Sequence, residues 1–305
     1  MEIIHLKHSQ IDKAKWDDCI DHSLNRMVYA QSWYLDIVCA GWEALVAADY
    51  EAVMPLTYGN KYGIKYLYQP FFTQQLGIFS RKGSDQKMVE EFLISIPAEF
   101  RFIEIALNKG NNCQLPEFQI GNNVNYELNL DKPYSEIANG YSSNTNRNLK
   151  KANQSMISII QDVSTGKLIQ LFRNNMGKGI KNLKTGHYEL LKQIMDKSLL
   201  ERNAEIFGVN SVGGELCAGA FFLKSFDSYI FLFSATNEES KENGAMFMII
   251  DQFIRKHAGE RSILDFEGSN IISLARFYKS FGAEELNYIR IKKNNLPPLL
   301  KLFKS

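Results

Sequence analysis

The chain has 305 residues, of which 45% are hydrophobic, and it carries 35 Lys and Arg against 34 Asp and Glu. The apolar fraction is ordinary for a globular protein and argues against a disordered chain. The formal net charge of +1 gives no global field that would attract nucleic acid or an anionic membrane. A polyanion would therefore have to meet a local basic patch.

The cysteines and histidines show no ligand or disulfide spacing. Cys19, Cys39, Cys113 and Cys217 form no Cys-x-x-Cys pair, and the five histidines do not cluster with them. This pattern argues against a zinc site and against a disulfide scaffold. No basic and apolar leader is recognisable, and no apolar run reaches the roughly 18 residues of a membrane span. We therefore expect a reduced, cytoplasmic protein with no metal and no membrane span.

The N-terminal half is predicted to mix helices and strands. Apolar periodicity indicates helices at 11–20, 31–40 and 84–95. It indicates strands at 3–6, 43–58, 61–68, 74–79, 100–107 and 124–130. Gly59-Asn60, between two of these runs, is predicted to be the turn of a hairpin.

The C-terminal half repeats this style around a three-stranded meander. Helices are predicted at 144–153, 166–174, 187–201, 239–257 and 272–281. Strands are predicted at 156–161, 205–212, 215–223, 228–235, 262–267 and 287–292. Gly213-Gly214 is predicted to join the first two meander strands. We place the domain boundary near 131–133, which gives an N-terminal domain at 1–132 and a C-terminal domain at 133–305.

Two carboxylates at the end of the strand at 262–267 are the most informative polar pair. Side chains alternate along a strand, so Asp265 and Glu267 would share one face while Leu264 and Phe266 pack on the other. Buried carboxylates are costly unless they are paired or used. One of them could act as a general base. The alternative is that both are salt-bridged to a nearby Arg or Lys.

The helix at 272–281 carries a second group of candidates. Its apolar residues recur at helical spacing, and Gly282 follows as a natural C-terminal cap. Arg276 and Lys279 fall on the other face, where they would meet either an anion or solvent. Tyr278 could donate a proton, or could be a core aromatic with a satisfied hydroxyl.

Basic residues gather in two further places. Arg147, Lys150 and Lys151 form a basic stripe on the polar helix at 144–153. The loop at 173–184 combines lysines with glycines, which suits either a mobile, anion-seeking segment or a plain solvent loop.

Motifs of covalent or nucleotide chemistry are absent from the sequence. It contains no Walker pattern, no Gly-x-Gly-x-x-Gly fingerprint and no Gly-x-Ser-x-Gly elbow. Direct group transfer is therefore the better enzymatic hypothesis. The stretch 237–245 holds one late glycine and three acids, and acids at the start of the following helix would repel a pyrophosphate.

At these segments the chain resembles a known family. The order of three meander strands, a long helix, segment 265–269 and segment 275–283 resembles the GNAT-fold acyltransferases of the Fem type, the bacterial FemAB/FemX peptidoglycan aminoacyltransferases. Segment 143–152 resembles the helix that opens their second domain, and Tyr68-Gln69 belongs to a segment that resembles part of their first domain. The resemblance implies an α+β (mixed α/β) fold: a tandem duplication of GNAT-like domains with mostly antiparallel sheets flanked by helices.

The resemblance also implies N-acyl transfer by direct attack of an amine. The donor would be an acyl-CoA thioester or an aminoacyl-tRNA as co-substrate, with no covalently bound cofactor. The acceptor would be a small molecule or a cell-envelope precursor; tRNA is the nucleic acid that this allows, and DNA is not expected. The catalytic candidates are Asp265, Glu267 and Tyr278. The candidate substrate and anion contacts are Arg147, Lys150, Lys151, Arg276, Lys279, Tyr68 and Gln69. A catalytically inactive tandem GNAT-fold ligand-binding module remains the alternative.

Overall fold

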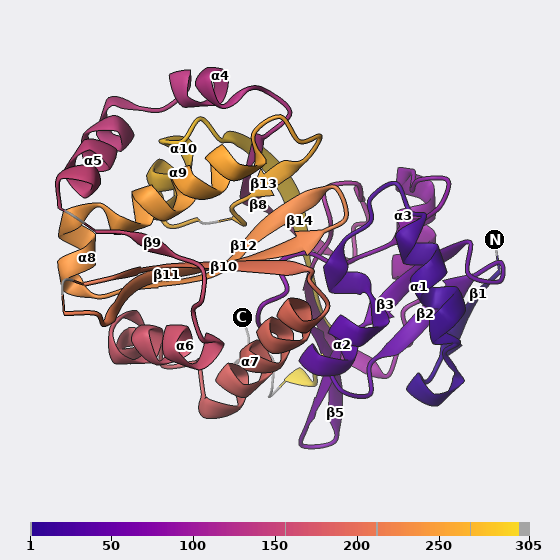
Figure 1. The fold of residues 1–305 in the computed structure, drawn as a ribbon. Helices are drawn as coiled ribbons and strands as arrows, with labels where there is room; N and C mark the ends of the chain where they lie inside the picture. Colours follow the sequence, from indigo (N-terminus) through magenta and orange to yellow (C-terminus); the bar gives the residue numbers. More distant parts are fainter. Residues whose placement is uncertain (1, 156, 212, 269, 299–305) are drawn as a thin grey trace. The chain divides into compact units, whose positions relative to one another are not determined.

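The computed structural model describes residues 2–155, 157–211, 213–268 and 270–298, and the chain forms two compact units (Figure 1). One unit contains residues up to 124 together with those from 287 onward, and the other contains residues 125–286. The chain enters the second unit within strand β8 (Gln119–Asn129) and leaves it within β14 (Glu284–Asn294). The border thus falls inside a strand, before the position expected from the sequence, and the last strand returns to the first unit.

The first unit contains two groups of paired strands. One is an antiparallel sheet in the order β1 (Ile3–Leu6), β2 (Glu43–Ala47), β3 (Ala52–Leu56) and β6 (Phe79–Ser80). In the other, β5 (Ile64–Tyr68) pairs antiparallel with β4 (Tyr58–Lys61) and parallel with β7 (Phe100–Ala106), and β7 pairs antiparallel with β14. The helices are α1 (Lys13–Asp21), α2 (Ser32–Val38) and α3 (Gln86–Ile94). Apolar side chains from both strand groups and from α3 form one buried core.

The hairpin turn predicted at Gly59-Asn60 lies three residues further along the chain, at Tyr62-Gly63. Both residues lie inside β4, and the reversal into β5 is made by Tyr62 and Gly63, whose φ angles are +54° and +78°. Two consecutive residues with positive φ match the right-handed twist of the flanking strands. The glycine that the turn requires is therefore Gly63.

In the second unit, consecutive strands pair in the order β8, β13, β12, β11, β10 and β9. The meander strands β10 (Ala204–Asn210), β11 (Leu216–Ser225) and β12 (Ser228–Thr236) pair antiparallel, as predicted, and β9 (Ile159–Ile160) borders β10. On the other side, β13 (Ile263–Asp265) runs parallel to β12, and β8 pairs antiparallel with β13. The helices of this unit are α4 (Tyr134–Asn139), α5 (Ser143–Gln154), α6 (Thr165–Asn174), α7 (Thr185–Leu200), α8 (Glu238–Asn243), α9 (Ala245–His257) and α10 (Ile272–Lys279).

Helices cover both faces of the meander. Figure 1 shows α6 and α7 on one face and α9 on the other. On the α6 face, Gly219 allows close approach, because a Cβ there would lie 2.7 Å from Leu168 Cδ1. On the α9 face, Phe222 and Phe253 stack with ring centroids 3.8 Å apart. Within the described residues, no helix has both the length and the hydropathy of a membrane span.

The segment from α4 to α5 is fastened to α9 and α10 by polar contacts. Asp251 on α9 accepts hydrogen bonds from the hydroxyls of Tyr134 (2.8 Å) and Tyr141 (3.1 Å). At the start of α5, the buried Thr145 hydroxyl lies 2.7 Å from the Ser280 carbonyl oxygen at the end of α10. These contacts place α5 beside the N-terminal end of α9.

Candidate functional site

The candidate site begins where two parallel strands part. β12 and β13 pair over only three positions, the last of them Ile230 with Asp265, and β12 continues to Thr236. β13 stops because the chain turns at Glu267, whose φ of +56° lies in the left-handed region. A non-glycine residue held there is strained by about 1–3 kcal/mol, so its surroundings must stabilise it. The Asp265 carboxylate does so by accepting the Glu267 N–H at 2.8 Å.

This turn corrects one sequence inference. The strand predicted at 262–267 ends at Asp265, so side-chain alternation does not extend to Glu267. Asp265 is 5% exposed, whereas Glu267 is partly exposed. Strand alternation therefore does not place the two carboxylates on one face; instead, the Glu267 backbone N–H donates to the Asp265 carboxylate.

A pocket of about 270 Å³ occupies the space beside the extended end of β12. Its walls come from β12, α8, the first turn of α9, and α10, with one residue from the 3₁₀ turn at Met176–Gly179. Most of the lining side chains are apolar, and the polar side chains come from the end of β12 and from α8. The residues are Met176, Phe231, Ser234, Ala235, Thr236, Ser240, Lys241, Gly244, Met246, Phe247, Leu274, Phe277 and Tyr278.

The helix predicted at 239–257 is divided at this pocket. Gly244 has a φ of +78° and separates α8 from α9, because a left-handed residue cannot continue a right-handed helix. The acids of this stretch therefore lie on α8, where Glu238 pairs with Lys241 at 2.6 Å, and the first turn of α9 contains no acidic residue. The acids expected at the start of the long helix therefore lie on a separate short helix instead.

The first turn of α9 borders the pocket. The Ala245 N–H is bonded to Asn243 Oδ1 at 3.0 Å, and the Met248 N–H to the Gly244 carbonyl at 3.1 Å. Between them stand Met246 and Phe247, which both line the pocket. The first N–H groups of a helix have no acceptor within the helix and favour negative charge nearby.

Tyr278 is the sequence-predicted site residue that lines this pocket. It is 8% exposed, and its ring stacks on Phe266 at 5.1 Å. Burial, and then the carboxylate of Glu267, raise the pKa of Tyr278 above its ordinary value. The hydroxyl is therefore protonated at neutral pH and can donate a hydrogen bond or a proton, but it is poorly suited to act as a base.

The basic candidates lie outside the lining of the pocket. Arg147, Lys150 and Lys151 are exposed on α5, and Arg147 donates to Asn144 Oδ1 at 2.8 Å. α5 approaches the pocket closely, since a Cβ on Gly244 would lie 2.5 Å from the Asn148 carbonyl oxygen.

The two cations predicted on α10 are also exposed. Arg276 is exposed near the middle of the helix. Lys279 is ion-paired with Glu285 at 2.6 Å, and its ammonium lies 5.5 Å from the centre of the Tyr126 ring. Lys279 is therefore engaged in holding the strand that follows α10.

Tyr68 and Gln69 lie in the first unit and are bound there. Gln69 accepts the Ala106 N–H at 3.0 Å and donates to the Thr73 carbonyl at 2.8 Å, so its amide supports the end of β7. Burial, and next the Cys39 thiol, raise the pKa of the Tyr68 hydroxyl. These contacts favour a structural role for both side chains over an anion-binding role.

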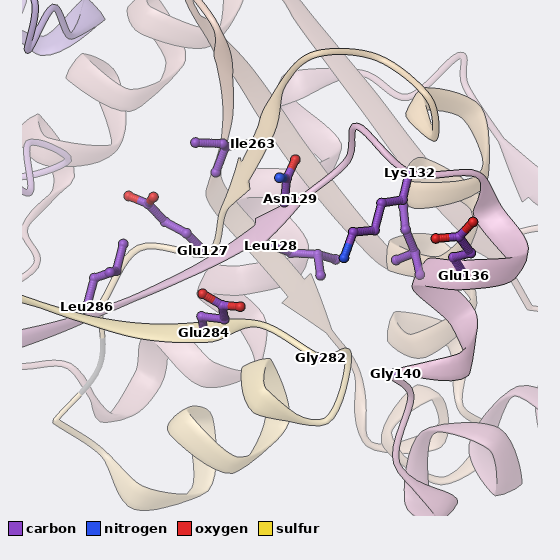
Figure 2. Close-up of a pocket in the computed structure, with 11 residues that line it drawn as sticks. Glu127, Leu128, Asn129, Lys132, Glu136, Gly140, Ile263, Gly282, Glu284 and Leu286 are labelled. Carbon is purple, nitrogen blue, oxygen red and sulfur yellow. The ribbon is translucent and has the colours of Figure 1, made fainter.

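A second hollow, also in the unit formed by residues 125–286, was not anticipated from the sequence. Figure 2 shows it between β8, α4 and the segment after α10, and its volume is about 380 Å³. Its charged lining consists of Glu127, Lys132, Glu136 and Glu284. Three carboxylates against one ammonium suit a cationic group better than a phosphate. The four charges come from three separate segments, so no sequence pattern could have joined them all.

One group in the first unit offers metal-ligand chemistry. Ligand atoms of His5, Glu43 and Glu99 lie within 4.8 Å of one another, and Glu43 is buried. However, the Lys7 ammonium lies 3.0 Å from Glu43 and 2.9 Å from Glu99, and Lys65 lies 3.4 Å and 3.2 Å from the same carboxylates. Two ammonium groups already balance the two carboxylates, so the group is better explained as an ionic network.

Comparison with known proteins gives a clear result at the level of fold. No protein-family model matches the sequence, and no curated protein matches it. A crystal structure of FemX is 13% identical, with a TM-score of 0.67 over 100% of both chains. The chain has the FemX fold. The predicted FemX-like, mixed α+β fold is therefore confirmed.

Two further solved structures share the FemX-like fold. A conserved protein of unknown function from Bacteroides thetaiotaomicron is 12% identical, with a TM-score of 0.59 over 92% of this chain and 97% of that one. L-PGS from Bacillus licheniformis is 10% identical, with a TM-score of 0.55 over 96% of this chain and 95% of that one. At such identities the likeness concerns the fold alone.

Proposed function

We propose that this protein is an N-acyltransferase that works in the pocket beside Tyr278. The observation that carries the proposal is the composition of that pocket: apolar walls, a buried and protonated tyrosine hydroxyl, and the first turn of α9. An acyl donor needs apolar walls, and a departing thiolate or alkoxide needs a hydroxyl that donates to it. The oxyanion that develops needs N–H donors. The FemX-like fold adds support, because the family resemblance associates it with acyl transfer to amines.

The proposed reaction is a direct transfer. The acceptor nitrogen attacks the donor carbonyl carbon, and the oxyanion that forms is stabilised by N–H groups at the start of α9. The Glu267 carboxylate takes a proton from the nitrogen, while Tyr278 gives its proton to the departing sulfur or oxygen. The C–S or C–O bond breaks, an amide is formed, and the proton held by Glu267 restores the tyrosine.

The proposed donor is an acyl-CoA thioester or an aminoacyl-tRNA, and the proposed acceptor is an amine on a cell-envelope precursor or a small molecule. An aminoacyl-tRNA would use a local basic surface, because phosphate neutralisation dominates such binding. The exposed Arg147, Lys150 and Lys151 on α5 would provide that surface beside the pocket. An acyl-CoA would need fewer cations.

The test is Tyr278→Phe against a matched control. The control is Tyr126→Phe, since Tyr126 is a buried tyrosine 6.0 Å from the Tyr278 ring whose hydroxyl bonds Glu285 and which does not line the pocket. Transfer is followed by release of free thiol from acyl-CoA, or by release of labelled amino acid from tRNA, with a panel of amines. The four buried cysteines give little thiol background.

We expect Tyr278→Phe to lower kcat by roughly 10²-fold or more, with little change in thermal stability, and Tyr126→Phe to leave kcat nearly unchanged. Equal activity of both variants would refute the role of Tyr278. Binding of a donor without turnover by any amine would favour the catalytically inactive ligand-binding module.

A further inference from the structure

The walls of the proposed donor pocket are more apolar than an aminoacyl group would require. Its lining includes four aromatic rings and four other apolar side chains: Phe231, Phe247, Phe277, Tyr278, Met176, Met246, Leu274 and Ala235. Among the described lining residues, Lys241 is the one with a charged side chain, and none carries a carboxylate. The ammonium of an aminoacyl ester would be buried there without a counter-charge, which is costly.

The same pocket contains a buried hydroxyl that lacks a protein partner. Ser240 is 1% exposed and lines the pocket, and its Oγ has no hydrogen-bond partner among the described residues. Buried polar groups in native proteins are nearly always bonded, so an unpartnered hydroxyl beside a pocket is a candidate partner for a bound polar group. Ser240 belongs to the polar side of the pocket, with Thr236 and Lys241.

We infer that the pocket binds an apolar acyl chain of medium length, with the polar head of that chain hydrogen-bonded by Ser240. This inference rests on the proposed function, of which it names the donor class. An engineered cavity of about 150 Å³ holds benzene, so a pocket of about 270 Å³ accommodates, in proportion, roughly ten carbon atoms. The preferred acyl group is therefore expected near eight to ten carbons.

The surroundings of the pocket extend its apolar character. Met176, which lines the pocket, is 46% exposed, so it also forms part of the surface. Ile271 and Ile272, at the start of the helix that contributes Leu274, are 60% and 69% exposed. Met176 is therefore the lining side chain through which the apolar wall reaches the surface.

The inference predicts a dependence of binding on chain length. Each methylene that the pocket buries is expected to lower Kd by about fourfold. Isothermal titration of the full chain with acetyl-, butyryl-, octanoyl-, decanoyl- and hexadecanoyl-CoA would measure it. We expect Kd to fall at least about 100-fold from two to eight carbons and to level off near ten. Free octanoate, titrated separately, tests the acyl part without the CoA part.

Two substitutions on one helix provide a matched pair. Met246→Trp fills the pocket, whereas Met248→Trp changes a similarly half-buried methionine of α9 that does not line it. Met246→Trp is expected to remove the gain from two to eight carbons, and Met248→Trp to retain it. If the tryptophan at 246 prevents folding, Met176→Gln at a partly exposed wall position should weaken octanoyl-CoA binding and spare acetyl-CoA binding. Ser240→Ala should weaken all chain lengths by roughly threefold to tenfold.

The outcomes separate this inference from the proposed function. A Kd that does not change between two and ten carbons would overturn the inference that the pocket binds an apolar acyl chain. A Met246→Trp variant that keeps the full gain would do the same. The proposed N-acyl transfer would still stand if an acetyl or aminoacyl donor turns over. Chain-length selection in binding, lost in Met246→Trp, would support the inference even if no amine were acylated, and in that case the proposed function would fail alone.

Discussion

Gly244 is the position where a single added methyl group should disturb the site most. It divides α8 from α9, it lines the pocket, and it has a φ of +78°. A Cβ at this position would lie 2.5 Å from the Asn148 carbonyl oxygen and 3.2 Å from the adjacent carbonyl carbon. These are backbone atoms of α5, so Gly244→Ala can be accommodated only if a whole helix shifts.

The size of the effect can be estimated because the chain offers a control. Gly259 has a similar φ of +88°, yet a Cβ there would meet no heavy atom of the described residues within 4 Å. Gly259→Ala therefore introduces the left-handed strain alone, about 1–2 kcal/mol. Gly244→Ala adds an overpacking cost of about 1–3 kcal/mol. We expect the free energy of unfolding to fall by about 1 kcal/mol in Gly259→Ala and by about 3 kcal/mol in Gly244→Ala.

Urea unfolding of the two variants and the parent protein measures this difference, with thermal unfolding as a second observable. About 1 kcal/mol corresponds to roughly 2–4 °C in Tm for a unit of this size. Gly244→Ala should also weaken donor binding, because α5 borders the polar side of the pocket. Equal losses of stability in the two variants would refute the close contact between Gly244 and α5.

Two further predictions concern ionisable groups of the second unit. His257, which is 3% exposed, lies between Glu205 (3.0 Å) and Glu260 (2.8 Å); these carboxylates outweigh the burial of the ring and raise the pKa of His257. The stabilisation of the folded state by the charged His257 is therefore complete below the unfolded pKa of about 6.5, and it is lost as pH rises through the higher folded pKa. Urea unfolding should show the stabilities of the parent and of His257→Gln converging above that range. A constant gap between them would contradict this. Asp265→Ala should lower the free energy of unfolding by about 1–3 kcal/mol. Asp265→Asn should lower it by less, because the amide oxygen can still accept the Glu267 N–H. Equal losses in the two variants would show that this acceptor does not hold the turn.

The parts of the fold that follow from local periodicity were predictable. The meander of β10, β11 and β12 and the helices on either side of it match the apolar patterns, because their side chains alternate or recur toward one shared core. The three local errors, at the 59–60 hairpin, in the 239–257 helix and at the end of the 262–267 strand, concern residues with positive φ. Gly59-Asn60 and Tyr62-Gly63 both contain a glycine, so the sequence does not distinguish which of them makes the turn. Gly244 sits within a continuous helical pattern. In both cases the tertiary contacts decide which position bends.

The candidate site was predictable only in part. Tyr278 was singled out and does line the pocket, and Glu267, in the segment singled out, is where the chain turns; residue 269 of that segment lies outside the described residues. Ser240 was not singled out, since an isolated serine in a polar helix has no distinguishing pattern. Only the folded structure shows that this hydroxyl is buried, lacks a partner among the described residues and belongs to a residue that lines the pocket.

The pocket depends on the early end of β13, which connects its strained turn to its chemistry. The Asp265 carboxylate holds the Glu267 N–H, and this contact maintains the left-handed residue that ends the strand. Because β13 ends there, β12 continues from Phe231 to Thr236 beyond the last parallel pair, and Phe231, Phe247 and Tyr278 line the space that remains. The strained turn at Glu267 and the buried Asp265 carboxylate thus both lie where β13 ends and the hollow beside the continuing part of β12 begins.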